Sequence, residues 1–113
     1  MSTATLPNID PKLFDKSKWS DRVSIDGVFS KGFTTVPFSV VVDPRLSEDA
    51  FRLYSLYMGF AARGNGTMPR ERDQRELLGL SEKQFARARN QLIDCGFISL
   101  EDGQIRIEAG DRR

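Results

Sequence analysis

The chain has 113 residues, which is the size of a single domain. Its 17 basic and 16 acidic residues give a net charge of +1, which argues against a purely charge-driven binder of nucleic acid or membranes. The sequence has no histidine and one cysteine, so it excludes histidine-based catalysis, histidine or cysteine-cluster metal sites and an intrachain disulfide.

We divide the chain into an N-terminal arm, a domain and a C-terminal tail, at residues 1–21, 22–107 and 108–113. Two prolines and weak hydrophobic periodicity predict irregular structure in the arm. Its Phe14 and Trp19 are candidates for docking onto the domain or onto a protein partner. A tail with no function of its own is the alternative.

The stretch after the arm favours β structure. Val23 and Ile25 alternate ahead of the tight-turn pair Asp26-Gly27, which indicates a small hairpin. Residues 33–36 then form a β-favouring run that is ended by a proline. We therefore expect a short β segment before the first long helix. The apolar run at residues 40–42 fits more than one structure.

Two helices are predicted next. Ser47 is a suitable N-cap for a helix over about residues 48–62, whose apolar side chains cover most of its circumference and make it the central core helix. A second helix spans roughly residues 70–78, because Pro69 suits its start. Gly79 provides a tight turn after it.

The third helix is predicted over residues 82–95. Ser81 is a good N-cap, and Gly96 supplies a left-handed stop. The spacing of apolar residues places one face of this helix toward the core, formed by Phe85, Ala88 and Leu92. A β-hairpin follows at residues 97–100 and 104–107, with a type I′ turn at Asp102-Gly103.

This order of elements resembles a known family. Residues 33–107 are similar to the winged helix-turn-helix domains of phage and plasmid replication proteins and of small bacterial transcription regulators. The matching stretches are FTTVPFSVVVDPRLSEDAFRLYSLY, GTMPRERDQRELLGLS, EKQFARARNQLIDCGFISL and DGQIRI. The leucine followed by Cys-Gly-Phe-Ile resembles the family's "Leu…Gly-Leu-Ile" exit into the wing. The resemblance implies a mainly α (α+β) fold of three helices plus a C-terminal hairpin wing.

The same resemblance implies binding of double-stranded DNA, in transcription regulation or DNA replication, with helix 82–95 in the major groove. Two features depart from the family pattern. Gln74-Arg75 stands where the family usually has a Leu-Ala pair, so that Arg75 replaces the small residue that lets the second and third helices approach closely. The wing tip, Glu101-Asp102, is acidic, so we expect little or no contact between the tip and phosphate.

Helical geometry identifies the residues expected to meet DNA. On the face of the third helix opposite Phe85 and along its flank lie side chains that can pair with base edges, whereas the arginines of the second helix suit phosphates. The candidate DNA-binding residues are Ser81, Lys83, Gln84, Arg87 and Asn90, with Arg70, Arg72 and Arg75 on the second helix and Arg106 on the hairpin.

Other functions are weighed against this one. A winged helix that docks onto a polymerase, replisome or other host protein is the main alternative, and a homodimer through residues 23–42 or the arm is a further expectation. No phosphate loop, metal-ligand cluster or nucleophile–base pair appears, so we expect neither an enzyme nor a cofactor. No apolar run resembles a signal peptide or a membrane span, which favours a cytoplasmic protein without a membrane partner.

Overall fold

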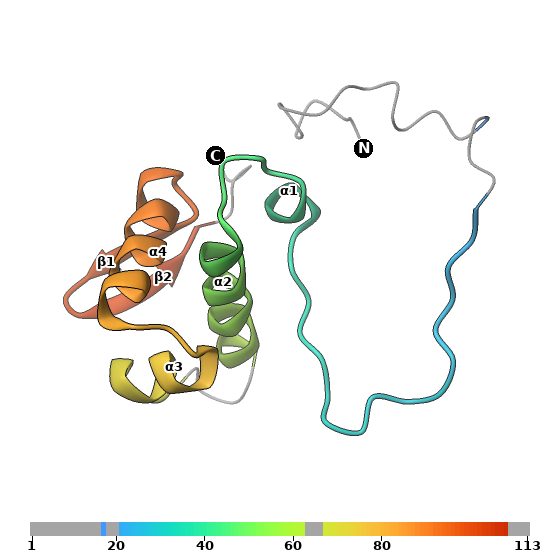
Figure 1. Ribbon diagram of the computed structural model, residues 1–113, viewed down its shortest axis with the longest axis horizontal. Coiled ribbons are helices and arrows are strands. Elements are labelled where there is room, and N and C mark those ends of the chain that lie inside the picture. The colour runs from blue at the N-terminus through green and yellow to red at the C-terminus, as the bar shows by residue number, and fades with distance from the viewer. Residues whose placement is uncertain (1–16, 18–20, 63–66, 109–113) are drawn as a thin grey trace.

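The computed structural model describes Ser17, residues 21–62 and residues 67–108. Its elements are α1 (Phe38–Val41), α2 (Glu48–Ala61), α3 (Glu71–Leu78), α4 (Glu82–Asp94), β1 (Ile98–Glu101) and β2 (Gln104–Ile107) (Figure 1). The described chain is thus mainly helical with one small antiparallel sheet, which confirms an α+β class. The three longer helices and the hairpin lie where the sequence predicts them.

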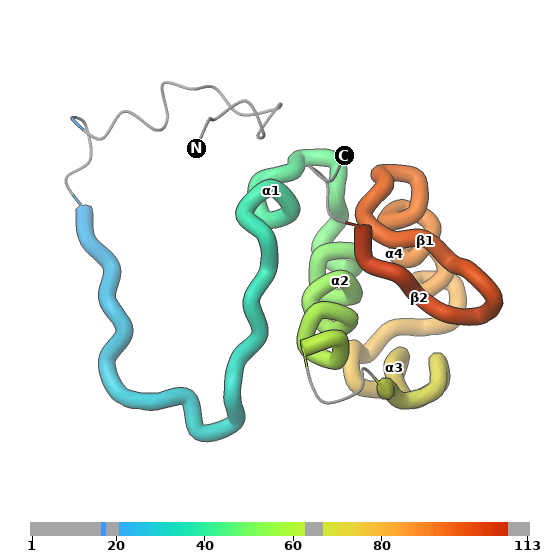
Figure 2. The backbone as a smooth tube through the Cα atoms, turned by 180° about the vertical axis from the view of Figure 1, so that it is seen from behind, coloured from blue at the N-terminus to red at the C-terminus, as the bar shows by residue number. Residues whose placement is uncertain are grey.

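Helix α2 forms the centre of the core. Ser47 caps it, because its side chain accepts a hydrogen bond from the backbone N–H of Ala50 at 3.1 Å. Leu53, Tyr54 and Tyr57 are buried along its length. Helix α4 and the hairpin lie on one side of α2, and α1 lies on the other (Figures 1 and 2).

The hairpin follows α4 without a long loop. Gly96 has a left-handed φ of 81°, and the N–H of Phe97 donates to the carbonyl of Leu92 at 3.0 Å, which ends the helix in a Schellman arrangement. The strands pair from Ile98 opposite Ile107 to Glu101 opposite Gln104. Asp102 and Gly103 both have positive φ, at 53° and 76°, which confirms the predicted type I′ turn.

The prediction of a short β segment before the first long helix is wrong. None of the described residues from 21 to 47 lies in a strand, and the predicted hairpin at Asp26-Gly27 does not form. Its apolar residues Val23 and Ile25 are 96% and 75% exposed, so no burial or ladder compensates for the ordering of a strand. Instead, Pro37 leads into the short helix α1.

The apolar run at residues 40–42 forms the end and the C-cap of helix α1. Val40 is buried in the core, whereas Val41 is exposed on the helix surface. Phe14 and Trp19 lie outside the described residues, as does nearly all of the predicted arm and tail, so those assignments stay predictions. None of the described helices is long and apolar enough to cross a membrane.

Candidate nucleic-acid interface

A tight turn sets the direction in which α4 leaves α3. Gly79 adopts a left-handed conformation (φ 71°, ψ 33°), and the N–H of Leu80 reaches back to the carbonyl of Arg75 at 2.9 Å. A side chain other than glycine would be strained at this φ. Arg52 of α2 donates from Nη1 to the carbonyl of Leu78 at 2.9 Å, which fixes the end of α3 against the core helix.

The start of α4 is held by a reciprocal capping box. Ser81 Oγ accepts from the backbone N–H of Gln84 at 3.1 Å, and Gln84 Oε1 accepts from the backbone N–H of Ser81 at 2.9 Å. Both residues were predicted to bind DNA. Their side chains are committed to the helix start in this structure, although the amide group of Gln84 can still donate to another partner.

The inner face of α4 matches its prediction. Phe85, Ala88 and Leu92 are buried against the core. Gln91 at the edge of this face accepts a hydrogen bond through Oε1 from the backbone N–H of Ser47 at 2.7 Å. This long-range bond ties α4 to the start of α2 and therefore fixes the rotation of α4 about its own axis.

The outer face of α4 presents polar side chains to solvent. Lys83, Arg87 and Asn90 are exposed, and within the described part of the chain none of them has a hydrogen bond or ion pair from its side chain. Asp94 is exposed at the end of the same helix. Periodicity alone places these side chains outward, and the structure agrees with that orientation. Their binding to DNA stays a prediction.

The arginines of α3 divide into two kinds. Arg70, at the N-cap of α3, and Arg72 are exposed and have no carboxylate partner among the described residues. Arg75 is half-buried, with 22% of its side chain exposed. Its Nε lies 3.8 Å from Oε2 of Glu71, and its Nη2 lies 3.9 Å from Oε2 of Glu82. Its Nε is buried without a hydrogen-bond partner. Arg75 is therefore less available to phosphate than the sequence suggests.

Glu71 links α3 to α4 through Arg89, and it also pairs with Arg75 on its own helix. The Glu71 carboxylate accepts a hydrogen bond from Nη1 of Arg89 on α4 at 3.2 Å. The Arg89 guanidinium also lies over the ring of Phe85, with 5.5 Å from its central carbon to the ring centroid. Ion pairs and stacking thus occupy both arginines at the contact between the two helices.

Gln74, the first residue of the Gln74-Arg75 departure, occupies an interior position. It is buried, and its Nε2 donates to the carbonyl of Pro69 at 2.7 Å. This bond satisfies one donor of an amide that is costly to bury unpaired. The sequence shows the departure at Gln74-Arg75. It does not show that the buried amide of Gln74 pairs with the carbonyl of Pro69, five residues earlier in the chain.

The hairpin carries little free positive charge. Arg106, predicted to contact DNA, pairs with Glu101 on the opposite strand, with 2.6 Å between Nη2 and Oε1. With Asp102 also at the tip, the end of the hairpin is acidic. This ion pair could have been predicted from the sequence, because a type I′ turn at Asp102-Gly103 places Arg106 and Glu101 diagonally across the two strands.

The candidate interface therefore consists of the outer face of α4 and the first turn of α3. Among the described residues, no group of three or more His, Cys, Asp or Glu side chains is placed to hold a metal ion. No protein-family model, curated protein or solved structure matches this chain.

Proposed function

We propose that the protein is a winged helix-turn-helix DNA-binding protein whose α4 enters the major groove of double-stranded DNA. The observation that carries this proposal is the group of exposed, unpaired side chains Lys83, Arg87 and Asn90 on one face of a helix whose start and rotation are fixed. A rigidly held helix loses little conformational freedom when it binds, which favours specific contacts.

The order of elements supports the proposal. Helices α2, α3 and α4 are followed directly by a hairpin, and a left-handed glycine separates α3 from α4. In helix-turn-helix proteins the second helix of the motif reads the groove and the first crosses the phosphate backbone. In this protein α4 takes the first role and α3 the second.

The side-chain chemistry assigns roles within the interface. Arg87 suits the paired acceptors of guanine, and Asn90 suits adenine. Lys83 adds a donor near the start of α4. Arg70 and Arg72 suit phosphate oxygens, which position the protein without reading sequence. The biological setting that fits is a transcription regulator or a replication accessory factor of a phage, plasmid or bacterium.

A binding assay with a matched arginine control tests the proposal. Fluorescence anisotropy with labelled duplexes, selected from a random pool, is measured at two salt concentrations for the native chain, Arg87→Ala and Arg22→Ala. Arg22 is an exposed arginine far along the chain from α4. We expect Arg87→Ala to weaken binding about 10-fold or more and Arg22→Ala to change it by less than about 2-fold.

Two results would contradict DNA binding. One is an affinity that does not fall with salt, and the other is an equal loss for the two arginine variants.

A second candidate function is a protein-docking winged helix. It is favoured by the hairpin, where Glu101 pairs with the basic residue Arg106. Leu100 is 51% exposed next to the Glu101–Arg106 pair, so the hairpin offers an apolar and acidic surface rather than a basic one. Such a module would bind a polymerase or another replisome protein through the hairpin. Absence of duplex binding at low salt, together with a partner interaction that Leu100→Ser removes, would support this function over the first.

A further inference from the structure

The segment before α1 exposes an unusual amount of apolar surface. Val23, Ile25, Val28, Phe29 and Phe33 are between 56% and 96% exposed, and they lie within eleven residues. Together they expose on the order of 500 Å² of side-chain surface. Apolar surface of this amount on one segment is more typical of a binding segment than of a surface that stays in contact with water.

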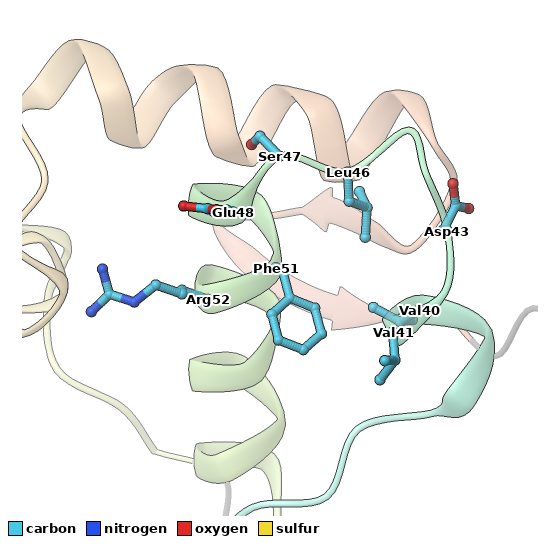
Figure 3. A pocket seen from close by; sticks show the side chains of 8 residues that line it. All are labelled: Val40, Val41, Asp43, Leu46, Ser47, Glu48, Phe51 and Arg52. Carbon is cyan, nitrogen blue, oxygen red and sulfur yellow. The ribbon is translucent and has the colours of Figure 1, made fainter.

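The outer face of α2 offers a groove for such a segment. Val40, Val41, Leu46 and Phe51 line a hollow of about 320 Å³ between α1 and the start of α2, where Phe51 points toward the two valines (Figure 3). A second hollow of about 380 Å³ continues along the helix, lined by Leu56, Phe60 and Leu78 among others. Arg52 borders both hollows, so together they follow α2 from Glu48 to Phe60.

The dimensions of the groove and the segment agree. Glu48 to Phe60 spans about 18 Å at a rise of about 1.5 Å per helical residue. An extended chain rises about 3.3 Å per residue, so six or seven residues, such as Val23 to Phe29, match that length. Asp26 in the middle of the segment also complements Arg52, which bonds a carbonyl but has no carboxylate partner in the described structure.

The segment does not lie in the groove of its own chain. Thr34 lies against α2, where a Cβ added to Gly59 would be 3.6 Å from Thr34 Oγ1. The chain then turns, with the N–H of Gly32 bonded to the carbonyl of Phe29 at 3.1 Å and a positive φ at Gly32. Beyond this turn residues 21–28 run on the side away from α2 (Figures 1 and 2). A second copy can fill the groove without undoing the turn.

We propose that two copies of this chain pair by exchanging this segment, so that residues 23–29 of each copy lie in the α2 groove of the other. Reciprocal exchange gives a two-fold dimer. The exposed Val23, Ile25, Val28 and Phe29 of the two segments contribute on the order of 800 Å². The groove surfaces that they cover bring the total above the roughly 1,000 Å² expected of a specific protein interface. Helix α4 lies on the side of α2 opposite to α1 (Figure 1). The proposed dimer therefore leaves the outer face of α4 uncovered.

Sedimentation equilibrium of the full chain tests the proposal without DNA. We compare the native chain with Ile25→Asp/Phe29→Asp and with the matched control Ser24→Asp/Ser30→Asp, which adds the same charge at polar positions of the same segment. At about 100 µM we expect twice the 12.8 kDa monomer mass for the native chain and the control. The apolar double variant should raise the dimer Kd at least about 100-fold, with an unchanged helical circular dichroism spectrum.

Isotope-filtered NMR on a mixture of labelled and unlabelled chains identifies the occupant of the groove. We expect NOEs between copies from the Ile25 methyl groups to the ring of Phe60 or the methyl groups of Leu56. A native monomer at about 100 µM, a dimer that Ile25→Asp/Phe29→Asp leaves intact, or contacts within one copy only would each overturn the proposal. None of these measurements involves DNA, so the proposed DNA binding stands or fails separately.

Discussion

Arg106 and Arg87 are both exposed arginines, but in the described structure only Arg106 lies within reach of a carboxylate, 2.6 Å from Glu101. A paired arginine must lose its partner or share it before it can neutralise a phosphate. We therefore predict that Arg106→Ala changes duplex affinity by less than about 2-fold, whereas Arg87→Ala costs about 10-fold or more. Anisotropy titrations of both variants check this difference, and equal losses would show that the hairpin contributes as much as α4.

Asp43 provides a pH-dependent contact within one residue pair. Arg45 donates to its carboxylate from Nη2 at 2.6 Å and from the backbone N–H at 2.9 Å. These bonds, led by the one from the Arg45 side chain, hold the pKa of Asp43 below its ordinary value of 3.8. Because the folded pKa is lowered, the contact stabilises the fold above the ordinary pKa and is lost as the pH falls through the lowered value.

We predict from this contact that Asp43→Asn lowers the midpoint of thermal unfolding at pH 7. The difference in unfolding midpoint between this variant and the native chain should become smaller below pH 3.8 and disappear as the pH falls further. Scanning calorimetry over a pH series measures it, with the exposed Asp21→Asn as the control. A gap that stays constant with pH would contradict the assigned role of the ionised carboxylate.

At the scale of elements, Ser81 stabilises the helix that carries the proposed interface. Ser81→Ala removes the acceptor of the capping box and should destabilise the protein by about 1 kcal/mol. Ser81→Asp keeps a capping acceptor and suits the positive helix end, so it should keep the stability but weaken DNA binding by charge repulsion. Urea unfolding and anisotropy separate the two effects. Equal stability of the two variants would argue against the capping role.

Glu71 forms one of the ion pairs between α3 and α4, with Arg89, and a second pair with Arg75 on its own helix. Glu71→Gln weakens ion pairs with two partly buried arginines, Arg75 and Arg89, so we predict a loss of about 1 kcal/mol of unfolding free energy. Glu76→Gln on the same helix makes the same charge change at an exposed position that has no ion pair among the described residues. Chemical denaturation compares the two variants, and an equal loss would assign the effect to net charge alone.

Helices and strands differed in how far the sequence predicts them. The long helices have local signals, namely the caps Ser47 and Ser81 and apolar spacing along one chain segment. The Asp102-Gly103 turn likewise has a local cause. The β-favouring run at residues 33–36 needs a partner strand to become a strand, and the described chain supplies none there. Its propensity alone therefore misled the prediction.

The sequence predicts which side chains of the candidate site point outward, but it does not predict how many of its arginines are free of ion pairs. Periodicity identifies the outward side chains of α4, because the rotation of a helix follows from its apolar face. The states of Arg75 and Arg106 depend on partners from a neighbouring helix and strand, so counting basic residues overstates the free positive charge. The groove along α2 could not be predicted from the sequence, because its two hollows are lined by residues far apart in the chain, from α1, α2, Thr34 and the end of α3.

For the whole molecule, near-neutral net charge limits the electrostatic part of DNA binding. The available cations of the proposed interface are Arg70, Arg72, Lys83 and Arg87. Two to four phosphate contacts, from Arg70 and Arg72 alone or with Lys83 and Arg87 added, give a slope of log affinity against log salt of about −2 to −4, on a scale of about −0.9 per contact. Anisotropy over a salt series measures this slope. A slope steeper than about −6 would show that further basic residues contact the DNA.

The outer face of α4 is the surface that we propose binds DNA. The most direct measurement is a ¹⁵N–¹H NMR titration of the full chain with a duplex selected by the protein. The proposal predicts the largest shift changes at Lys83, Arg87 and Asn90, with smaller ones at Arg70 and Arg72. Shift changes confined to the hairpin or to residues 21–41, or no change at low salt, would contradict it.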